Sequence, residues 1–123
     1  MNKICTSIEQ SKKLIELGID VNTADMWFHP YPNDEYWYDI PNIGNADLEY
    51  NQLPCWSPNA LLDILKTKCE RLEIILRVDN KWNIFATRSN FIYNNAYDCG
   101  CENIIDGCVD LIVKMNDYDD KIF

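Results

Sequence analysis

Apolar and polar positions repeat with two different periods along the chain, and these periods predict helices separated by hairpins. Over residues 6 to 18, apolar residues recur at helical spacing while lysines and glutamates occupy the other side. Thr6 and Glu9 form a capping-box pair, and Ser7 with Gln10 is the alternative frame one residue later. The chain therefore begins with a predicted helix.

A strand pattern follows this helix. Residues 24 to 28 alternate apolar and polar side chains, and residues 29 to 34 contain two prolines and two turn formers. We expect the chain to reverse there and to return as a second strand over residues 36 to 40. Residues 41 to 54 are rich in Pro, Asn and Gly and are predicted to form a loop.

The second half of the chain repeats the order of helix and hairpin. Ser57 is a good N-cap and Pro58 suits the first helical position, so a second helix begins there. After a hairpin, residues 91 to 93 are candidates for a short edge strand beyond an Arg88–Asn90 turn. A last helix, from Glu102 to about Asn116, carries a broad apolar stripe.

The hairpin over residues 72 to 87 has a predicted register. A three-residue loop, Asp79 to Lys81, places Leu76 opposite Ile84 and collects the apolar pairs on one buried face. A two-residue loop would scatter those pairs, so the hydrophobic pattern favours the longer loop.

The predicted order is α-β-β-α-β-β-(β)-α, in which three helices pack against antiparallel hairpins of four to five strands. This order defines an α+β fold. The length of 123 residues suits a single domain over residues 1–123, and 47% hydrophobic with 25% charged residues is ordinary globular composition. No apolar run approaches the roughly 18 residues of a membrane span, so we expect no membrane association.

The charge of the chain is acidic and uneven. The net charge is -9, which argues against direct binding of nucleic acid because phosphates need a positive surface. Residues 66 to 88 carry six basic and three acidic side chains, a net +3, so the remainder carries -12. These two regions could pair internally or between copies, which makes a homodimer possible.

Six cysteines occur at irregular spacing. The N-terminus has no apolar segment typical of export, so we expect a cytoplasmic protein with reduced thiols. Cys99, Cys101 and His29 are weak candidates for a metal site or a cysteine-based enzyme, because structural zinc usually has paired C-x₂₋₄-C ligands. Cys108 fits the apolar stripe of the last helix and should be buried. The sequence thus favours a non-catalytic protein with no catalytic residues, no metal and no cofactor.

Two features are candidate interaction surfaces. Glu102, Asp106 and Asp110 are spaced by four, and they form either a solvated helix face or an acidic ridge that docks a basic partner. An aromatic patch on the first hairpin is the other, since one sheet face cannot bury so many rings. The residues of this patch are Trp27, Tyr31, Tyr36, Trp37 and Tyr38.

Three stretches of the chain resemble a known group of proteins. They are Ile4–Met26, the Pro54-x-Trp56-Ser57-x-x-Ala60-Leu61-Leu62 segment and the Asp106–Val109 stretch of the last helix. The group consists of small uncharacterised proteins encoded by gut Bacteroides-type bacteria, their phages and mobile elements. The resemblance implies a cytoplasmic protein in a mobile-element setting and implies no activity.

Together these features predict a small acidic cytoplasmic protein that binds an unidentified protein partner. It would act as a non-catalytic accessory or modulator encoded by a phage or mobile element, with the aromatic hairpin as anchor and the acidic surface for steering. The alternatives are an acidic inhibitor that mimics nucleic acid, and a small Cys/His metal protein or enzyme.

Overall fold

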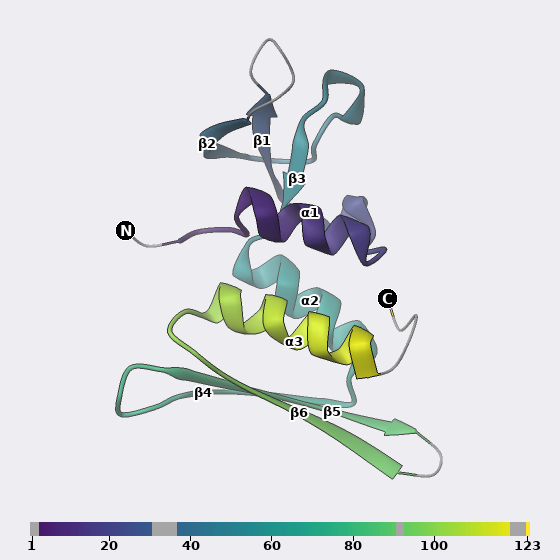
Figure 1. Cartoon of the computed structure of the whole chain (residues 1–123), viewed down its shortest axis with the longest axis vertical. Helices are drawn as coiled ribbons and strands as arrows, with labels where there is room; N and C mark the ends of the chain where they lie inside the picture. Colours follow the sequence, from purple (N-terminus) through teal and green to yellow (C-terminus); the bar gives the residue numbers. More distant parts are fainter. Residues whose placement is uncertain (1–2, 31–36, 91–92, 119–122) are drawn as a thin grey trace. The chain divides into compact units, whose positions relative to one another are not determined.

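The computed structural model describes residues 3–30, 37–90, 93–118 and 123, and it has the α+β class that the sequence predicts (Figure 1). The predicted order holds except that one further strand precedes the second helix, and the optional strand after the second hairpin is present. In chain order the elements are α1 (Ile8–Glu16), η1 (Val21–Thr23), β1 (Met26–Pro30), β2 (Trp37–Ile43), η2 (Leu48–Tyr50), β3 (Leu53–Cys55), α2 (Pro58–Lys68), β4 (Arg71–Leu76), β5 (Trp82–Asn90), β6 (Tyr93–Cys101) and α3 (Ile104–Tyr118).

The chain divides into two compact units, residues 1–60 and 61–123. Each unit has its own three-stranded antiparallel sheet, with strand order β2-β1-β3 in the first and β4-β5-β6 in the second. The described residues therefore form two sheets, and the expected single domain stays a prediction. Among the described residues, the helices all fall short of the length and apolar character that a bilayer span requires.

Helix α1 begins at Ile8 and is capped by Ser7, in the later of the two predicted frames. The Ser7 hydroxyl accepts from the Gln10 N–H, and the Gln10 side chain accepts from the Ser7 N–H at 3.0 Å. Thr6 has a different role because it is buried: its N–H donates to the Trp56 carbonyl at 2.9 Å, and its hydroxyl accepts from the Trp56 N–H at 3.0 Å. Thr6 thus ties the start of α1 to the end of β3.

The positions of the prolines are compatible with the strand order of the first sheet. The predicted loop over residues 41 to 54 is shorter at both ends and covers residues 44 to 52, because β2 runs through Pro41 to Ile43 and β3 contains Leu53 and Pro54. Both strands are edges of the sheet, where a residue without an N–H is tolerated. The central strand β1 pairs through Met26, Trp27 and Phe28 with both neighbours, and its proline stands at its last position.

The register of the second hairpin differs from the prediction by two residues. Leu76 pairs with Trp82, and Ile74 pairs with Ile84. The loop does have three residues, but they are Val78 to Asn80 and not Asp79 to Lys81, since the Arg77 N–H donates to the Lys81 carbonyl at 2.8 Å. Asn80 has φ 63°, the left-handed conformation that closes three-residue hairpin loops and that Asn tolerates.

Strands β5 and β6 are longer than the sequence suggests. The predicted turn at Arg88–Asn90 is the end of β5. Of the edge strand predicted over residues 91 to 93, residues 91 and 92 lie outside the described residues, and Tyr93 is the first residue of β6. Helix α3 packs on β5 and β6 (Figure 1). Its apolar stripe is buried as predicted at Ile105, Cys108, Val109, Leu111, Ile112 and Met115.

Candidate interaction surfaces

Strand β1 separates a core face from an outer face in the first unit. Met26 and Phe28 are buried and pack with Cys5, Leu53 and Cys55. Trp27 points the other way, as the alternation of a strand predicts, and it is half-buried. Its indole lies beside the His29 imidazole, with 6.1 Å between the ring centroids.

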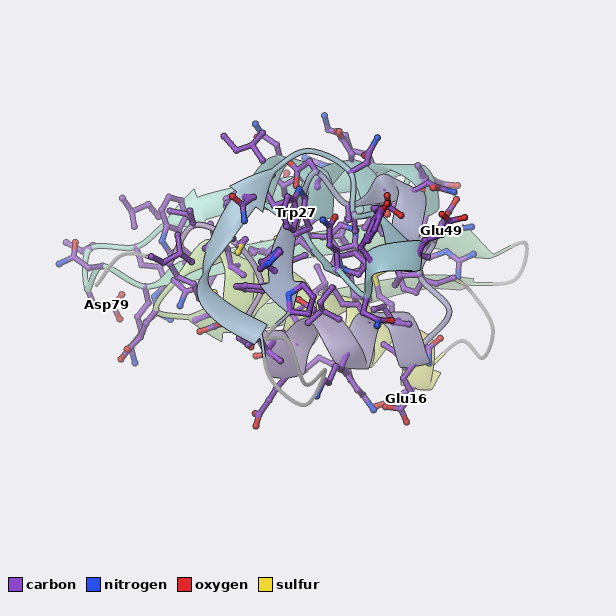
Figure 2. All side chains as sticks on the ribbon, turned by 90° about the horizontal axis from the view of Figure 1, so that it is seen from above. Glu16, Trp27, Glu49 and Asp79 are labelled. Atoms are coloured by element: carbon purple, nitrogen blue, oxygen red, sulfur yellow. The ribbon has the colours of Figure 1, made fainter. Side chains whose placement is uncertain are left out.

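Trp27 is therefore the member of the aromatic patch whose side chain the structure describes (Figure 2). Trp37 and Tyr38 belong to β2, but their side chains lie outside the described part of the chain. Tyr31 and Tyr36 lie outside the described residues altogether. The aromatic patch as a whole stays a prediction.

Large apolar side chains are exposed from the last residues of β2, the strand that pairs with β1 through Trp27, to the end of η2. Ile40 is 79% exposed, Ile43 88% and Tyr50 70%, and Leu48 is exposed as well. We call residues 40–50, which run from the end of β2 through η2, the 40–50 segment. It connects to the outer face of β1, because a Cβ atom on Gly44 would lie 3.7 Å from Trp27 Nε1.

Hydrogen bonds hold the 40–50 segment in place. The Gly44 N–H donates to the Asp25 carbonyl at 2.9 Å, which fastens the end of β2 to the start of β1. The Asp47 carboxylate accepts from the Glu49 N–H at 3.0 Å, and the Asp47 N–H donates to Gln52 Oε1 at 2.7 Å. Hydrogen bonds within the segment and to Asp25 and Gln52 therefore order it, while its large apolar side chains are exposed.

Sequence reasoning missed Ile40, Ile43, Leu48 and Tyr50 as surface residues. Ile40 ends the predicted strand over residues 36 to 40, so its sequence setting gives no sign of exposure. Ile43, Leu48 and Tyr50 are each isolated among Asn, Gly, Asp and Glu, and they lack a periodic pattern that would assign them to a core face. The sequence therefore did not predict their exposure.

The acidic ridge on α3 is shorter than expected. Glu102 is exposed but precedes the helix, which begins at Ile104. The Asp106 carboxylate accepts from Asn103 Nδ2 at 2.6 Å, while the Asp106 N–H donates to Asn103 Oδ1 at 2.8 Å. Asp106 thus takes part in the cap at the N-terminus of α3. Asp110 lies within the helix and is exposed, as the predicted ridge requires.

Two thiols meet in the core of the first unit. Cys5 and Cys55 are both buried, and a hydrogen bond joins their side chains. This hydrogen bond lowers the pKa of the Cys5 thiol, while the same bond and burial raise the pKa of Cys55. His29 stands on the opposite face of the sheet from Cys55, so the described part of this unit does not pair an imidazole with a buried thiol.

The candidate metal ligands fall in separate elements. Cys101 ends β6, where its thiol donates to the Trp82 carbonyl at 3.6 Å, and burial followed by the charges of Asp110 and Asp106 raises its pKa. Cys99 also belongs to β6, so both residues of this pair are in a strand; the side chain of Cys99 lies outside the described part. His29 belongs to the first unit. Within the described residues, no three His, Cys, Asp or Glu side chains are grouped so that they could hold a metal ion.

No family model, curated protein or solved structure matches this chain. The geometry of its own residues is therefore the basis for any functional conclusion.

Proposed function

We propose that this chain is a non-catalytic protein-binding protein, and that the 40–50 segment together with Trp27 is its binding surface. The observation that carries the proposal is the exposure of Ile40, Ile43, Leu48 and Tyr50 in a segment that hydrogen bonds hold in place. Exposed apolar groups that gather into one patch are typical of interaction sites, and Trp and Tyr are enriched among the residues that dominate binding energy. An ordered segment also loses little conformational freedom when a partner binds.

The charge of the chain supports a partner with a basic rim. Asp47 and Glu49 are exposed beside the apolar residues of the segment, and the whole chain carries -9. Opposite charges around an apolar contact accelerate association and select the partner more than they add affinity. We propose a cytoplasmic accessory or modulator encoded by a phage or mobile element, a setting that the resemblance of Ile4–Met26 supports.

Affinity capture from cells that express the gene tests this function. Tagged wild-type protein is compared with Ile40→Glu and Trp27→Ala, and Ile4→Glu is the matched control because Ile4 is another exposed isoleucine of the same unit. A partner retained by wild type and Ile4→Glu but lost by the other two supports the proposal. Equal recovery by all four proteins, or recovery of none above background, contradicts it.

A further inference from the structure

Strand β4 is an open edge with apolar side chains. It pairs with β5 on one side, and within the described residues no strand pairs with its other side. Ile74 is 38% exposed, Ile75 46% and Leu76 56%, and the neighbouring Val78 is fully exposed. The burial predicted for Leu76 was therefore wrong, because α3 covers β5 and β6 and leaves β4 beyond it. Natural edge strands are usually protected by charges, prolines or bulges against pairing with other chains.

The backbone of β4 can accept a further strand. Arg77 and Lys81 form a hydrogen-bonded pair, since the Arg77 N–H donates to the Lys81 carbonyl. Such pairs recur at every second residue of an antiparallel ladder, so Glu73 and Ile75 also bond to β5. Leu72, Ile74 and Leu76 then direct their N–H and C=O groups toward the open edge.

The side chains of residues 71–77 are complementary to the same residues read in reverse. Along β4 and the residue that follows it, one face carries Arg71, Glu73, Ile75 and Arg77, and the other carries Leu72, Ile74 and Leu76. If two copies pair antiparallel with Ile75 opposite Ile75, Glu73 of each copy faces Arg77 of the other. On the other face the same register places Ile74 opposite Leu76.

Existing ion pairs position these charges on the strand. Arg71 Nη2 lies 2.6 Å from Glu73 Oε1, and Arg77 Nη2 lies 2.8 Å from Asp79 Oδ2. Asp79 stands at the tip of the β4–β5 hairpin, beyond the end of the strand (Figure 2). Pairing of two copies would bring the Arg71–Glu73 ion pair of each copy beside the Arg77–Asp79 ion pair of the other. Positive and negative groups would then alternate at each end of the paired strands.

We infer that two copies of this chain associate through β4, antiparallel about a two-fold axis at Ile75, and so join their sheets into one of six strands. This register fits the open backbone groups, because Ile74 of each copy forms a hydrogen-bonded pair with Leu76 of the other when Ile75 faces Ile75. It also fits the charges, because Glu73 of each copy faces Arg77 of the other. The association uses the second unit and is independent of the proposed binding surface in the first.

Charge reversal tests the association. Sedimentation equilibrium of the wild type should give twice the chain mass of 14.4 kDa. Glu73→Lys and Arg77→Glu should each weaken dimerisation about tenfold or more, because each change brings like charges together twice in the symmetric pair. An equimolar mixture of the two variants should dimerise again. In the mixed dimer the introduced lysine of one variant faces the introduced glutamate of the other, and the unchanged Arg77 faces the unchanged Glu73. Restored pairing in the mixture also shows that both variants are folded.

Cysteine substitutions test the register. Ile75→Cys should form an intermolecular disulfide under mild oxidation, since non-hydrogen-bonded partners have Cα atoms about 4.5 Å apart, within disulfide range. Ile74→Cys is the matched control, because position 74 of one copy faces position 76 of the other. The two introduced cysteines are then separated by two residues along the strand. A monomeric wild type at high concentration, charge variants that dimerise like the wild type, a mixture that stays monomeric, or a cross-link at position 74 in place of 75 would each overturn the inference.

Discussion

Gly107 of α3 lies so close to Cys101 of β6 that a Cβ atom at position 107 would come within 2.3 Å of the Cys101 Sγ atom. The same Cβ would lie 2.9 Å from Cδ1 of Ile84 on β5. Any side chain at this position would therefore push α3 away from the sheet. The glycine is present for close approach, although it weakens the helix itself.

Gly107→Ala should destabilise the protein by about 1–3 kcal/mol, because overpacking against Cys101 outweighs the roughly 1 kcal/mol that alanine adds to helix stability. The free energy of unfolding from urea titration measures this. In a Cys101→Ala background the same substitution should cost much less, since the sulfur atom is gone. An equal cost in both backgrounds would show that Cys101 is not the obstacle.

Phe28→Ala should cost about 3–5 kcal/mol, because Phe28 is buried in the core of the first unit. Trp27→Ala should cost clearly less, since its ring is half-buried on the outer face. Thermal or chemical unfolding of the two variants gives the comparison. A loss of stability with Trp27→Ala as large as with Phe28→Ala would place Trp27 in the core and remove it from the proposed binding surface.

Asp25 supports the start of α2 through Ser57. Its carboxylate accepts from the Ser57 N–H at 2.9 Å and from the Ser57 hydroxyl, while that hydroxyl accepts from the Ala60 N–H at 3.3 Å. Asp25→Ala should cost about 1.5–3 kcal/mol, as expected for hydrogen bonds to a charged group. Asp20→Ala is the control, because Asp20 caps an exposed turn and should cost about 1 kcal/mol or less. Equal costs for the two variants would contradict this role.

The raised pKa values of three thiols predict that the protein loses stability at alkaline pH. Burial raises the pKa of Cys69 and Cys101, and the hydrogen bond with Cys5 together with burial raises that of Cys55, each above the usual value of 9.0. Above that value the unfolded chain releases protons that the folded chain retains, so the free energy of unfolding falls as pH rises. Each such thiol contributes up to about 1.4 kcal/mol per pH unit. The lowered pKa of Cys5 acts in the opposite direction.

Urea titrations under reducing conditions between about pH 8 and about pH 10 measure this slope. Cys101→Ala removes one retained proton, so its stability should fall less steeply with pH than that of the wild type. Parallel curves for the two proteins would show that the Cys101 thiol titrates normally in the fold.

The helices could be predicted because their signals are local. Ser57 caps the Ala60 N–H, and Pro58 begins α2, as the sequence indicates. The frame of α1 was ambiguous because Thr6 and Ser7 are both good caps. The choice depends on the contact of Thr6 with Trp56, which lies fifty positions away along the chain.

The strands were harder to predict because their pairing depends on the sheet. Pro41 and Pro54 favour loops in isolation, yet each stands on an edge strand where the missing N–H costs little. In the second hairpin a shift of two residues leaves every side chain on the same face, so the hydrophobic pattern cannot distinguish the two registers. The conformation of Asn80 decides between them.

The proposed binding surface was the least predictable part. The aromatic residues indicated the first hairpin, and Trp27 lies on its outer face. The exposure of Ile40 and Ile43 follows from the edge position of β2, which no local pattern reveals. Glu102 does not belong to the helix that carries the acidic ridge, because Asn103 caps α3 and the helix begins after it.

Site-specific photo-crosslinking tests the proposed function most directly. A photoreactive amino acid replaces Ile40 in one protein and Ile4 in another, both exposed residues of the first unit, and each is irradiated in the cells that express it. We predict a discrete adduct with one cellular protein from position 40 and none from position 4. Identical adducts from both positions, or none from either, would contradict a protein-binding surface at the 40–50 segment.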